Sequence, residues 1–220
     1  TSARIKTEGL AAWKYGRIEV SAKLPKGRGM WPAIWMLSEN RKEIGWPESG
    51  EIDIMEHVGY DNDTIHGTIH TKAYNHIKGT QKGKTIFIDN PNDTFHVFAI
   101  EWTPEKIDFI LDGLVYNHIE NEHKTTAEWP FDQKFYLILN VAVGGIWGGR
   151  KGIDDSIFPQ TSNRVIRMFF NPLDKTNFVF PITLSSGLGE LVCKHREKLH
   201  IILPSTFFLI KCLKVANLGT

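Results

Sequence analysis

Three acidic side chains lie close together in one short apolar segment, where their spacing could support acid–base chemistry. Residues 50–57 read Gly-Glu-Ile-Asp-Ile-Met-Glu-His. Side chains of a regular strand alternate between its two faces, so Glu51 and Asp53 share one face. The odd spacing from Glu51 to Glu56 would turn Glu56 into the apolar layer, where an unpaired carboxylate is costly. One extra residue in the strand, a β-bulge around Ile54-Met55, would return all three acids to one face.

Two glutamates on one face suit the hydrolysis of a glycosidic bond. Their Cα atoms would lie about 13 Å apart at ~3.3 Å per step. Side chains that lean inward would then bring the carboxyl groups to roughly 5 Å, the separation that a retaining glycosidase uses for a nucleophile and an acid/base. Asp53 would raise the proton affinity of a neighbouring acid, or hold the nucleophile through a shared proton.

Two other interpretations of these acids stay open. The segment could be a solvated edge face with alternating acids. It could also form a metal site, although no cysteine lies nearby and the spacing is not that of a tight zinc site. The potential ligands would be Glu51, Asp53, Glu56, His57, His66 and His70.

Tryptophans near the acids favour the carbohydrate interpretation. Trp31, Trp35 and Trp46 shortly precede the acids. An indole face stacks on the flat C–H face of a sugar, and its N–H can donate to hydroxyl groups. Trp147 lies in residues 144–149, a glycine-rich loop that would display its ring and that lacks the spacing of a phosphate-binding loop. The remaining tryptophans are expected to pack in the core or at its edge: Trp13, Trp102 and Trp129.

The elements that must position these residues are predicted to be β-strands. Short apolar or alternating runs recur between Gly, Pro, Asn and Asp residues, and no convincing helical stripe longer than about ten residues interrupts them. Asp112-Gly113 is a strong hairpin signal. Regularly spaced strands without helices predict a sandwich or barrel. The expected strands cover residues 17–24, 33–37, 51–58, 64–71, 95–102, 107–111, 114–119 and 135–143.

Composition is that of an ordinary soluble domain, or of one domain with a tail. The chain has 220 residues, of which 41% are hydrophobic and 23% charged. Its net charge of +1 gives no electrostatic argument for nucleic acid or a membrane surface. The longest apolar stretch, residues 199–213, is too short to span a bilayer. No signal peptide is recognised, and the two cysteines, Cys193 and Cys212, allow one disulfide.

A shift in composition predicts a boundary near Gln160. Residues 161–220 hold eight Lys or Arg and three acids, a net charge of +5, whereas the first 160 residues carry −4. All seven tryptophans precede this boundary and both cysteines follow it. We therefore expect a domain over residues 1–160 and a divergent basic tail over residues 161–220.

Several motifs together resemble glycoside hydrolase family 16, and in particular its laminarinase branch, the endo-1,3-β-glucanases. The similar motifs occur in residues 31–37, 45–47, 50–57 and 68–71, which read WPAIWML, GWP, GEIDIMEH and TIHT. Segments 15–19, 95–102 and 139–145 match in the same order. The resemblance covers residues 1–160. Its acid motif is specific because lichenase-type members lack the extra Met55.

This resemblance implies an all-β jelly-roll sandwich of two antiparallel sheets with a glycan cleft on the concave face. Glu51 would be the nucleophile, Glu56 the general acid and then general base, and Asp53 the assisting acid. His70 would hydrogen-bond near the leaving group or Asp53. The substrate-binding residues would be Trp31, Trp35, Trp46, Asn140 and Arg4, beside Trp147 from the glycine-rich loop.

The implied function is retaining endo-hydrolysis of β-1,3-glucan. The alternatives are a glycan-binding jelly-roll without turnover and an inactive fragment, and mixed-linkage β-1,3-1,4-glucan is the alternative substrate. The chain resembles the family from partway into its domain. We expect no required cofactor. The resemblance allows a structural calcium, but many members bind it through that earlier part and a late aspartate that has no counterpart here, so the calcium is in question for this chain. We also expect a monomer that acts outside the cell or in the periplasm.

Overall fold

The computed structural model describes residues 3–158 and the backbone of five short strands beyond them. The first part contains these elements: β1 (Ala3–Lys6), β2 (Gly16–Ala22), β3 (Met30–Ser38), α1 (Arg41–Ile44), β4 (Glu51–Glu56), β5 (Thr64–His70), β6 (Lys82–Phe87), β7 (His96–Trp102), β8 (Lys106–Leu111), β9 (Leu114–Glu120), β10 (Phe135–Val143) and the 3-10 turn η1 (Asp155–Ile157). The later strands are β11 (Gln160–Thr161), β12 (Arg167–Phe170), β13 (Asn177–Phe178), β14 (Ser185–Ser186) and β15 (Lys211–Leu213).

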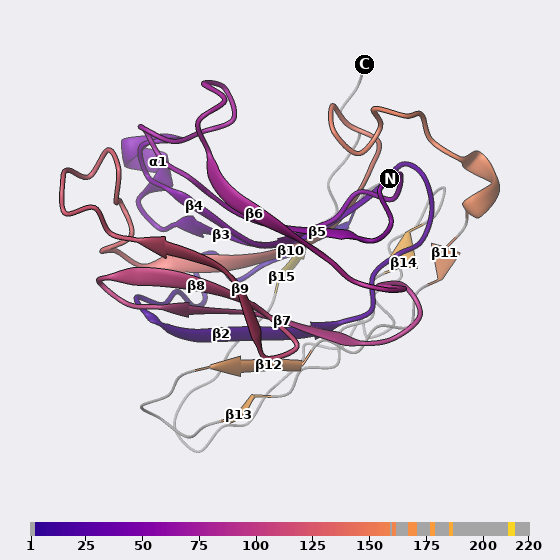
Figure 1. Ribbon diagram of the computed structural model, residues 1–220, viewed down its shortest axis with the longest axis horizontal. Helices are drawn as coiled ribbons and strands as arrows, with labels where there is room; N and C mark the ends of the chain where they lie inside the picture. The colour runs from indigo at the N-terminus through magenta and orange to yellow at the C-terminus, as the bar shows by residue number, and fades with distance from the viewer. Residues whose placement is uncertain are drawn as a thin grey trace.

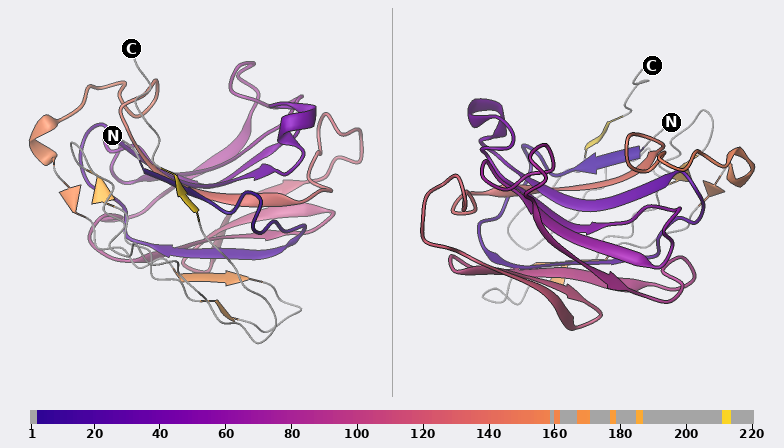
Figure 2. Two further views of the ribbon diagram at one scale, coloured as in Figure 1. Left: turned by 180° about the vertical axis from the view of Figure 1, so that it is seen from behind. Right: turned by 45° about the horizontal axis from the view of Figure 1, so that its top comes forward.

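Two antiparallel sheets stack in two layers (Figures 1 and 2). In the described residues, the larger sheet has the order β15-β1-β10-β3-β4-β5-β6 and the smaller sheet the order β13-β12-β2-β7-β8-β9. β4, which carries the three acids, lies inside the larger sheet between β3 and β5. The expected all-β sandwich of two antiparallel sheets is therefore confirmed.

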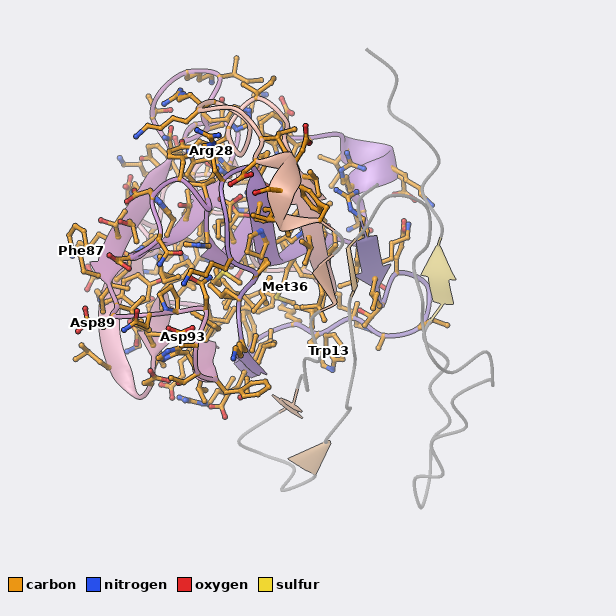
Figure 3. The ribbon with its side chains drawn as sticks, turned by 90° about the vertical axis from the view of Figure 1, so that its right-hand side faces the viewer. Trp13, Arg28, Met36, Phe87, Asp89 and Asp93 are labelled. Atoms are coloured by element: carbon orange, nitrogen blue, oxygen red, sulfur yellow. The ribbon has the colours of Figure 1, made fainter. Side chains whose placement is uncertain are left out.

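The core lies between the sheets and follows the period-two alternation of the strands. On β3, Met30, Ile34 and Met36 are buried in this core. In Figure 3, Met36 lies inside the molecule, whereas Phe87 of the edge strand β6 lies at its margin. Phe98, Phe109 and other large side chains of the smaller sheet fill the opposite side. Burying apolar surface in this core stabilises the folded chain by about 25 cal/mol per Å².

The outer face of the larger sheet carries the remaining side chains of the same strands. Leu37, Tyr136 and Ile138 form a second apolar cluster there, against which Trp35 and Trp46 pack. Loops rise above this face at both ends of the sheet (Figure 1). One is the loop of residues 71–81, and the other follows β10. The outer face is therefore lined with aromatic side chains and bordered by two loops.

Every expected strand is present, although most bounds shift by one to three residues. Asp112 and Gly113 form the expected hairpin turn, with φ values of 48° and 86°. Trp102 and Trp129 are buried, and Trp13 packs against the core, as expected. Sequence reasoning missed β1, β6, α1 and η1, which are short, polar or at a sheet edge. None of the described helices has the length and apolar character needed to cross a membrane.

After residue 158 the structure describes only parts of the backbone. Arg167–Phe170 forms β12, which pairs with β2, and Lys211–Leu213 forms β15, which pairs with β1. The domain boundary near Gln160 stays a prediction. The predicted disulfide between Cys193 and Cys212 lies outside the described residues, because the structure describes only the backbone of Cys212 and does not describe Cys193.

Candidate active site

The acid-bearing strand β4 contains the predicted bulge. Asp53 pairs with Thr68 and Glu56 pairs with His66, so three steps along β4 face two steps along β5. The register with β3 shifts at the same place. Ile52, Ile54 and Met55 are buried in the core. The extra residue therefore keeps the aliphatic side chains inside and places Glu51, Asp53 and Glu56 together on the outer face.

A glycine in a left-handed backbone conformation directly precedes this strand. Gly50, directly before Glu51, has a φ of 81°. A Cβ at this position would lie 2.8 Å from Cγ of Pro130 and 3.1 Å from Cζ of Phe135. Only glycine combines this left-handed conformation with such a close approach. The position of Glu51 thus depends on a backbone turn packed against the loop before β10.

At the Glu51 end of β4, a histidine contacts two of the acids. His70 of β5 pairs with Glu51 in register. Its Nε2 lies 3.3 Å from Oδ2 of Asp53 and 4.0 Å from Oε1 of Glu51. The ring of Trp46 lies 6.1 Å from that of His70, centroid to centroid. The indole N–H of Trp46 lies near Glu51 but makes no hydrogen bond of ordinary geometry with any described residue.

At the Glu56 end, an indole holds the acid directly. Nε1 of Trp31 donates a hydrogen bond of 3.1 Å to Oε1 of Glu56. Trp147 meets Trp31 edge to face at 5.5 Å, and its other neighbour is His66 of β5 at 4.9 Å. A Cβ on Gly148 would lie 2.7 Å from Cβ of Trp31, so the glycine-rich loop packs closely around this tryptophan.

The neighbouring strands extend this outer face. Nε1 of Trp35 donates a hydrogen bond of 2.6 Å to Oδ1 of Asn140 on β10. Arg4 of β1 pairs with Asn140 in register, and its guanidinium lies 5.1 Å from the ring centroid of Trp35. Trp35 itself pairs with Asp53. These side chains therefore form a continuous polar and aromatic surface beside the acids.

Burial makes all three acids hold protons more tightly than they would in water. Burial and the charge of Glu56 raise the pKa of Glu51 to about 7, and Trp46 partly offsets this rise. Burial raises the pKa of Glu56 to about 7, against the hydrogen bond from Trp31. Burial, followed by the charges of Glu51 and Glu56, raises the pKa of Asp53 well above its usual range. Near neutral pH the group can hold a proton on one carboxyl beside an ionised one.

His70 stays neutral in this environment. Burial lowers the pKa of His70 to about 4, and the charge of His76 adds to this effect. An imidazole that is neutral near pH 7 can orient Asp53 without adding a positive charge. It does not neutralise the acids, so their mutual repulsion persists.

Fewer residues could bind a metal together than the six potential ligands named from the sequence. Only Glu51, Asp53 and His70 come together among the described residues, with ligand atoms within 4.8 Å of one another. His57 is fully buried, and its Nδ1 lies 3.1 Å from the carbonyl oxygen of Thr64. Calcium takes six to eight oxygen ligands, so two carboxylates and an imidazole do not fit it.

All ten residues predicted for the site lie on this outer face or in the loops beside it. The chemical roles given to them stay predictions. Two further histidines lie on the same surface: sequence reasoning named His66 only as a possible metal ligand, and it did not single out His76. His66 shares its strand face with His70, so the period of β5 could have indicated it. His76 lies in the loop of residues 71–81, and no spacing pattern in the sequence marked it.

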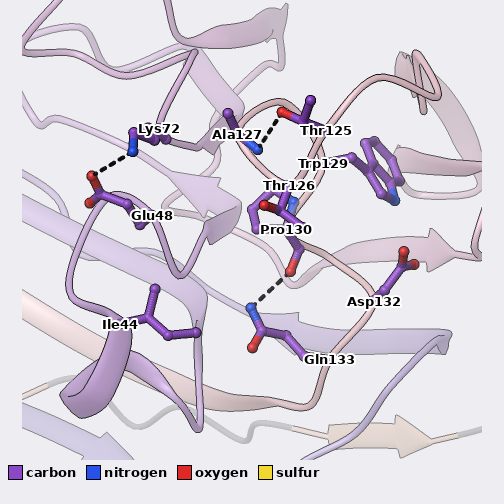
Figure 4. Close-up of a pocket in the computed structure, with 10 residues that line it drawn as sticks. All are labelled: Ile44, Glu48, Lys72, Thr125, Thr126, Ala127, Trp129, Pro130, Asp132 and Gln133. Carbon is purple, nitrogen blue, oxygen red and sulfur yellow. Dashed lines mark hydrogen bonds and ion pairs between the residues drawn. The ribbon is translucent and has the colours of Figure 1, made fainter.

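A separate cavity of about 510 Å³ lies between the loop before β4 and the loop before β10 (Figure 4). It contains none of the ten predicted residues. Glu48 and Lys72 face each other across it at 3.9 Å, and Nε2 of Gln133 donates to the carbonyl oxygens of Ser49 and Pro130. These polar groups bond to one another, so the acid-bearing face is the better candidate for chemistry. The lining residues are Ile44, Glu48, Lys72, Thr125, Thr126, Ala127, Trp129, Pro130, Asp132 and Gln133.

Comparisons with known proteins agree with this geometry. The profile of the family described as glycosyl hydrolases family 16 matches residues 1–158. A β-glucanase of Rhodothermus marinus is 55% identical over 167 residues, which cover 72% of this chain and 58% of that protein. A β-1,3-glucan-binding protein of Penaeus monodon is 38% identical over 177 residues, covering 67% of this chain and 48% of that protein.

A solved structure extends the likeness to the fold. The X-ray structure of the laminarinase from Rhodothermus marinus is 48% identical, with a TM-score of 0.71 over 76% of this chain and 70% of that one. The expected jelly-roll sandwich is thereby confirmed. The chain spans about half to three fifths of the length of the two curated relatives named above.

Proposed function

The chain belongs to the glycosyl hydrolases of family 16, and from this premise we propose that it hydrolyses internal bonds of β-1,3-glucan with retention of configuration. One observation carries the proposal. The bulge in β4 places two glutamates on one face, and burial raises the pKa of each to about 7. A retaining mechanism needs one ionised and one protonated carboxyl at the same pH.

We assign the nucleophile to Glu51 and the acid/base to Glu56. In the first step a carboxylate oxygen of Glu51 bonds to the anomeric carbon, while the bond to the leaving oxygen breaks and Glu56 gives that oxygen its proton. In the second step a water molecule gives a proton to Glu56 and attacks the same carbon, which releases Glu51. The net reaction adds one water molecule across one glycosidic bond.

Asp53 and His70 support Glu51 in this proposal. Asp53 is buried between the glutamates, and its raised pKa lets it hold a proton beside the nucleophile. Nε2 of neutral His70 lies 3.3 Å from Oδ2 of Asp53, an oxygen without a hydrogen bond to a described residue, and is placed to donate to that carboxyl once the ring reorients. Sugar units would bind along the outer face through Arg4, Trp31, Trp35, Trp46, Asn140 and Trp147.

The proposed linkage rests on the relatives. The similar solved structure is a laminarinase, which favours 1,3-linked glucan, with mixed-linkage β-1,3-1,4-glucan as the second substrate. A glycan-binding role without turnover is the second function, because one relative is a β-1,3-glucan-binding protein. A binding protein has no need for two glutamates with raised pKa values, so hydrolysis is the better proposal.

The remaining expectations stay part of this proposal. We propose that the activity needs no metal or other cofactor, because the double-displacement chemistry uses only the carboxyl groups of Glu51 and Glu56 and water. The partner is a polysaccharide rather than nucleic acid or a membrane, and the chain acts as a monomer outside the cell or in the periplasm.

The test is product analysis by mass spectrometry after incubation of the full chain with laminarin, lichenan and agarose. We expect oligosaccharides from laminarin, fewer from lichenan and none from agarose, with the same yield in EDTA. Glu51→Gln should release none, and its melting temperature should not fall below that of the wild type. If laminarin in the gel slows the migration of the wild-type chain but the chain releases no product, the chain binds glucan without hydrolysing it. If it neither binds nor cleaves, it is an inactive fragment.

A further inference from the structure

The loop of residues 71–81 places the side chain of His76 at the Glu51 end of β4. His76 has no role in the proposed chemical steps. The ring of His76 lies 5.1 Å from that of His70, at an interplanar angle of 85°. It also lies 5.0 Å from the ring of Trp46, at 33°. His76 therefore contacts both the histidine beside Asp53 and a tryptophan expected to bind sugar.

Hydrogen bonds within and beyond the loop fix the backbone around His76. Asn75, directly before it, is 1% exposed and donates from Nδ2 to the carbonyl oxygens of Thr71 and Lys72. Oδ1 of Asn75 accepts from the backbone N–H of Lys78 at 3.2 Å. The backbone N–H of Ala73 donates to Ala127 at 2.9 Å, which ties this loop to the one before β10. Backbone on both sides of His76 is thus fixed, which makes the ring a pre-positioned contact.

His76 also has unused bonding capacity. It is exposed, and neither ring nitrogen makes a hydrogen bond within the described part of the chain. The indole N–H of Trp46 is instead buried and lies near Glu51, so the ring face of Trp46 is what this side chain offers. A sugar ring presents a flat apolar face edged with hydroxyl groups, and hydroxyls can both donate and accept. An indole face beside an exposed imidazole with unbonded ring nitrogens complements that combination.

We infer that His76 is a substrate-binding residue that, together with Trp46, contacts the glucan unit bound on the Glu51 side of the acids. This inference rests on the proposed function and names a specificity residue for it. The ring of His76 contacts the sugar through its face and through one nitrogen. Because His76 contacts His70 and Trp46 and not the acids themselves, its loss weakens substrate binding much more than it slows the chemical steps.

The experiment compares His76→Ala with His76→Phe and with Ile77→Ala. Ile77 is the neighbouring residue, 74% exposed, and serves as the matched control. The full chain is assayed on laminaripentaose for KM and kcat, and each variant is melted to verify its fold. We expect His76→Ala to raise KM about three- to tenfold, with kcat changed less than about twofold. His76→Phe recovers part of this loss because it keeps the stacking face, and Ile77→Ala matches the wild type.

The inference is overturned if His76→Ala keeps the wild-type KM, or if KM and kcat change equally in His76→Ala and Ile77→Ala. Failure of the proposed function gives a different result, because the wild-type chain would then release no product. In that case binding of laminaripentaose is followed by tryptophan fluorescence. Weaker binding by His76→Ala than by wild type and Ile77→Ala supports the inference. Equal binding, or none by wild type, refutes it.

Discussion

The two glutamates lie at opposite ends of β4 and reach the same raised pKa in different surroundings. Glu56 accepts a hydrogen bond from Trp31, which is packed against the glycine-rich loop. Glu51 faces His70 and the exposed loop of His76. One end is thus closed by tight packing, whereas the other is bordered by a side chain with unpaired polar atoms. Burial sets the proton affinity at both ends, and at the Glu51 end the exposed imidazole of His76 has no hydrogen bond to any described residue.

The largest expected effect separates the chemical roles of the two ends. Glu56→Gln should lower kcat on laminarin by about 10²–10⁴-fold, yet it should still be glycosylated by a dinitrophenyl glycoside, whose leaving group needs no acid. Added azide should then restore turnover. Glu51→Gln should fail on both substrates because it lacks the nucleophile. Steady-state kinetics on both substrates measure this, and equal responses of the two variants would remove the distinction.

A pair of glycine substitutions compares the packing of the two loops. In Gly148→Ala, the new Cβ would lie 2.6 Å from the carbonyl oxygen of Gly144 and 2.7 Å from Cβ of Trp31. This overpacking should cost about 1–3 kcal/mol and displace Trp31. Gly79→Ala, in the loop of His76, meets no atom within 4 Å and has only its φ of 66° to strain it.

Gly79→Ala should therefore lower the free energy of unfolding by only about 1 kcal/mol. Urea unfolding measures both free energies of unfolding. Activity should fall in Gly148→Ala and persist in Gly79→Ala. A larger loss of stability at Gly79 would show that the Glu51 end is the more tightly packed one.

Stability should depend on pH because folding raises the pKa of the acids. Between an unfolded pKa near 4.5 and a folded pKa of about 7, the folded chain binds more protons, so these groups destabilise it as pH rises through that window. Glu56→Gln should therefore be more stable than wild type at pH 8, by about 1–3 kcal/mol. The advantage should vanish near pH 4. Thermal melts at both pH values test this, and an advantage at pH 4 alone would contradict it.

The smallest effect concerns the indole donors. Trp31→Phe removes the N–H that favours ionised Glu56, so the pKa of Glu56 should rise further and the basic limb of the pH–rate profile should move upward. Trp46→Phe should move that limb less, since Trp46 acts on Glu51 and not on Glu56. Profiles of kcat/KM against pH make the comparison. A larger shift in Trp46→Phe would reverse the assignment of the two ends.

The sequence predicted the part of this site that follows from strand periodicity. The odd spacing of Glu51 and Glu56 required a bulge, because a buried unpaired carboxylate is costly, and the register shift confirms it. β1 and the edge strand β6 were missed because their residues are few or mostly polar. His76 was missed because its position depends on the hydrogen bonds of Asn75, which alternation along a strand does not encode.

The assignment of Glu51 as nucleophile is the central claim, and trapping the intermediate tests it most directly. The full chain would be incubated with a 2-deoxy-2-fluoro β-laminaribiosyl glycoside that carries a dinitrophenyl leaving group, then digested and sequenced by mass spectrometry. We predict one fluoroglycosyl group per chain, attached to Glu51 and absent in Glu51→Gln. A label on Glu56 or Asp53, or release of dinitrophenol without any adduct, would contradict the account.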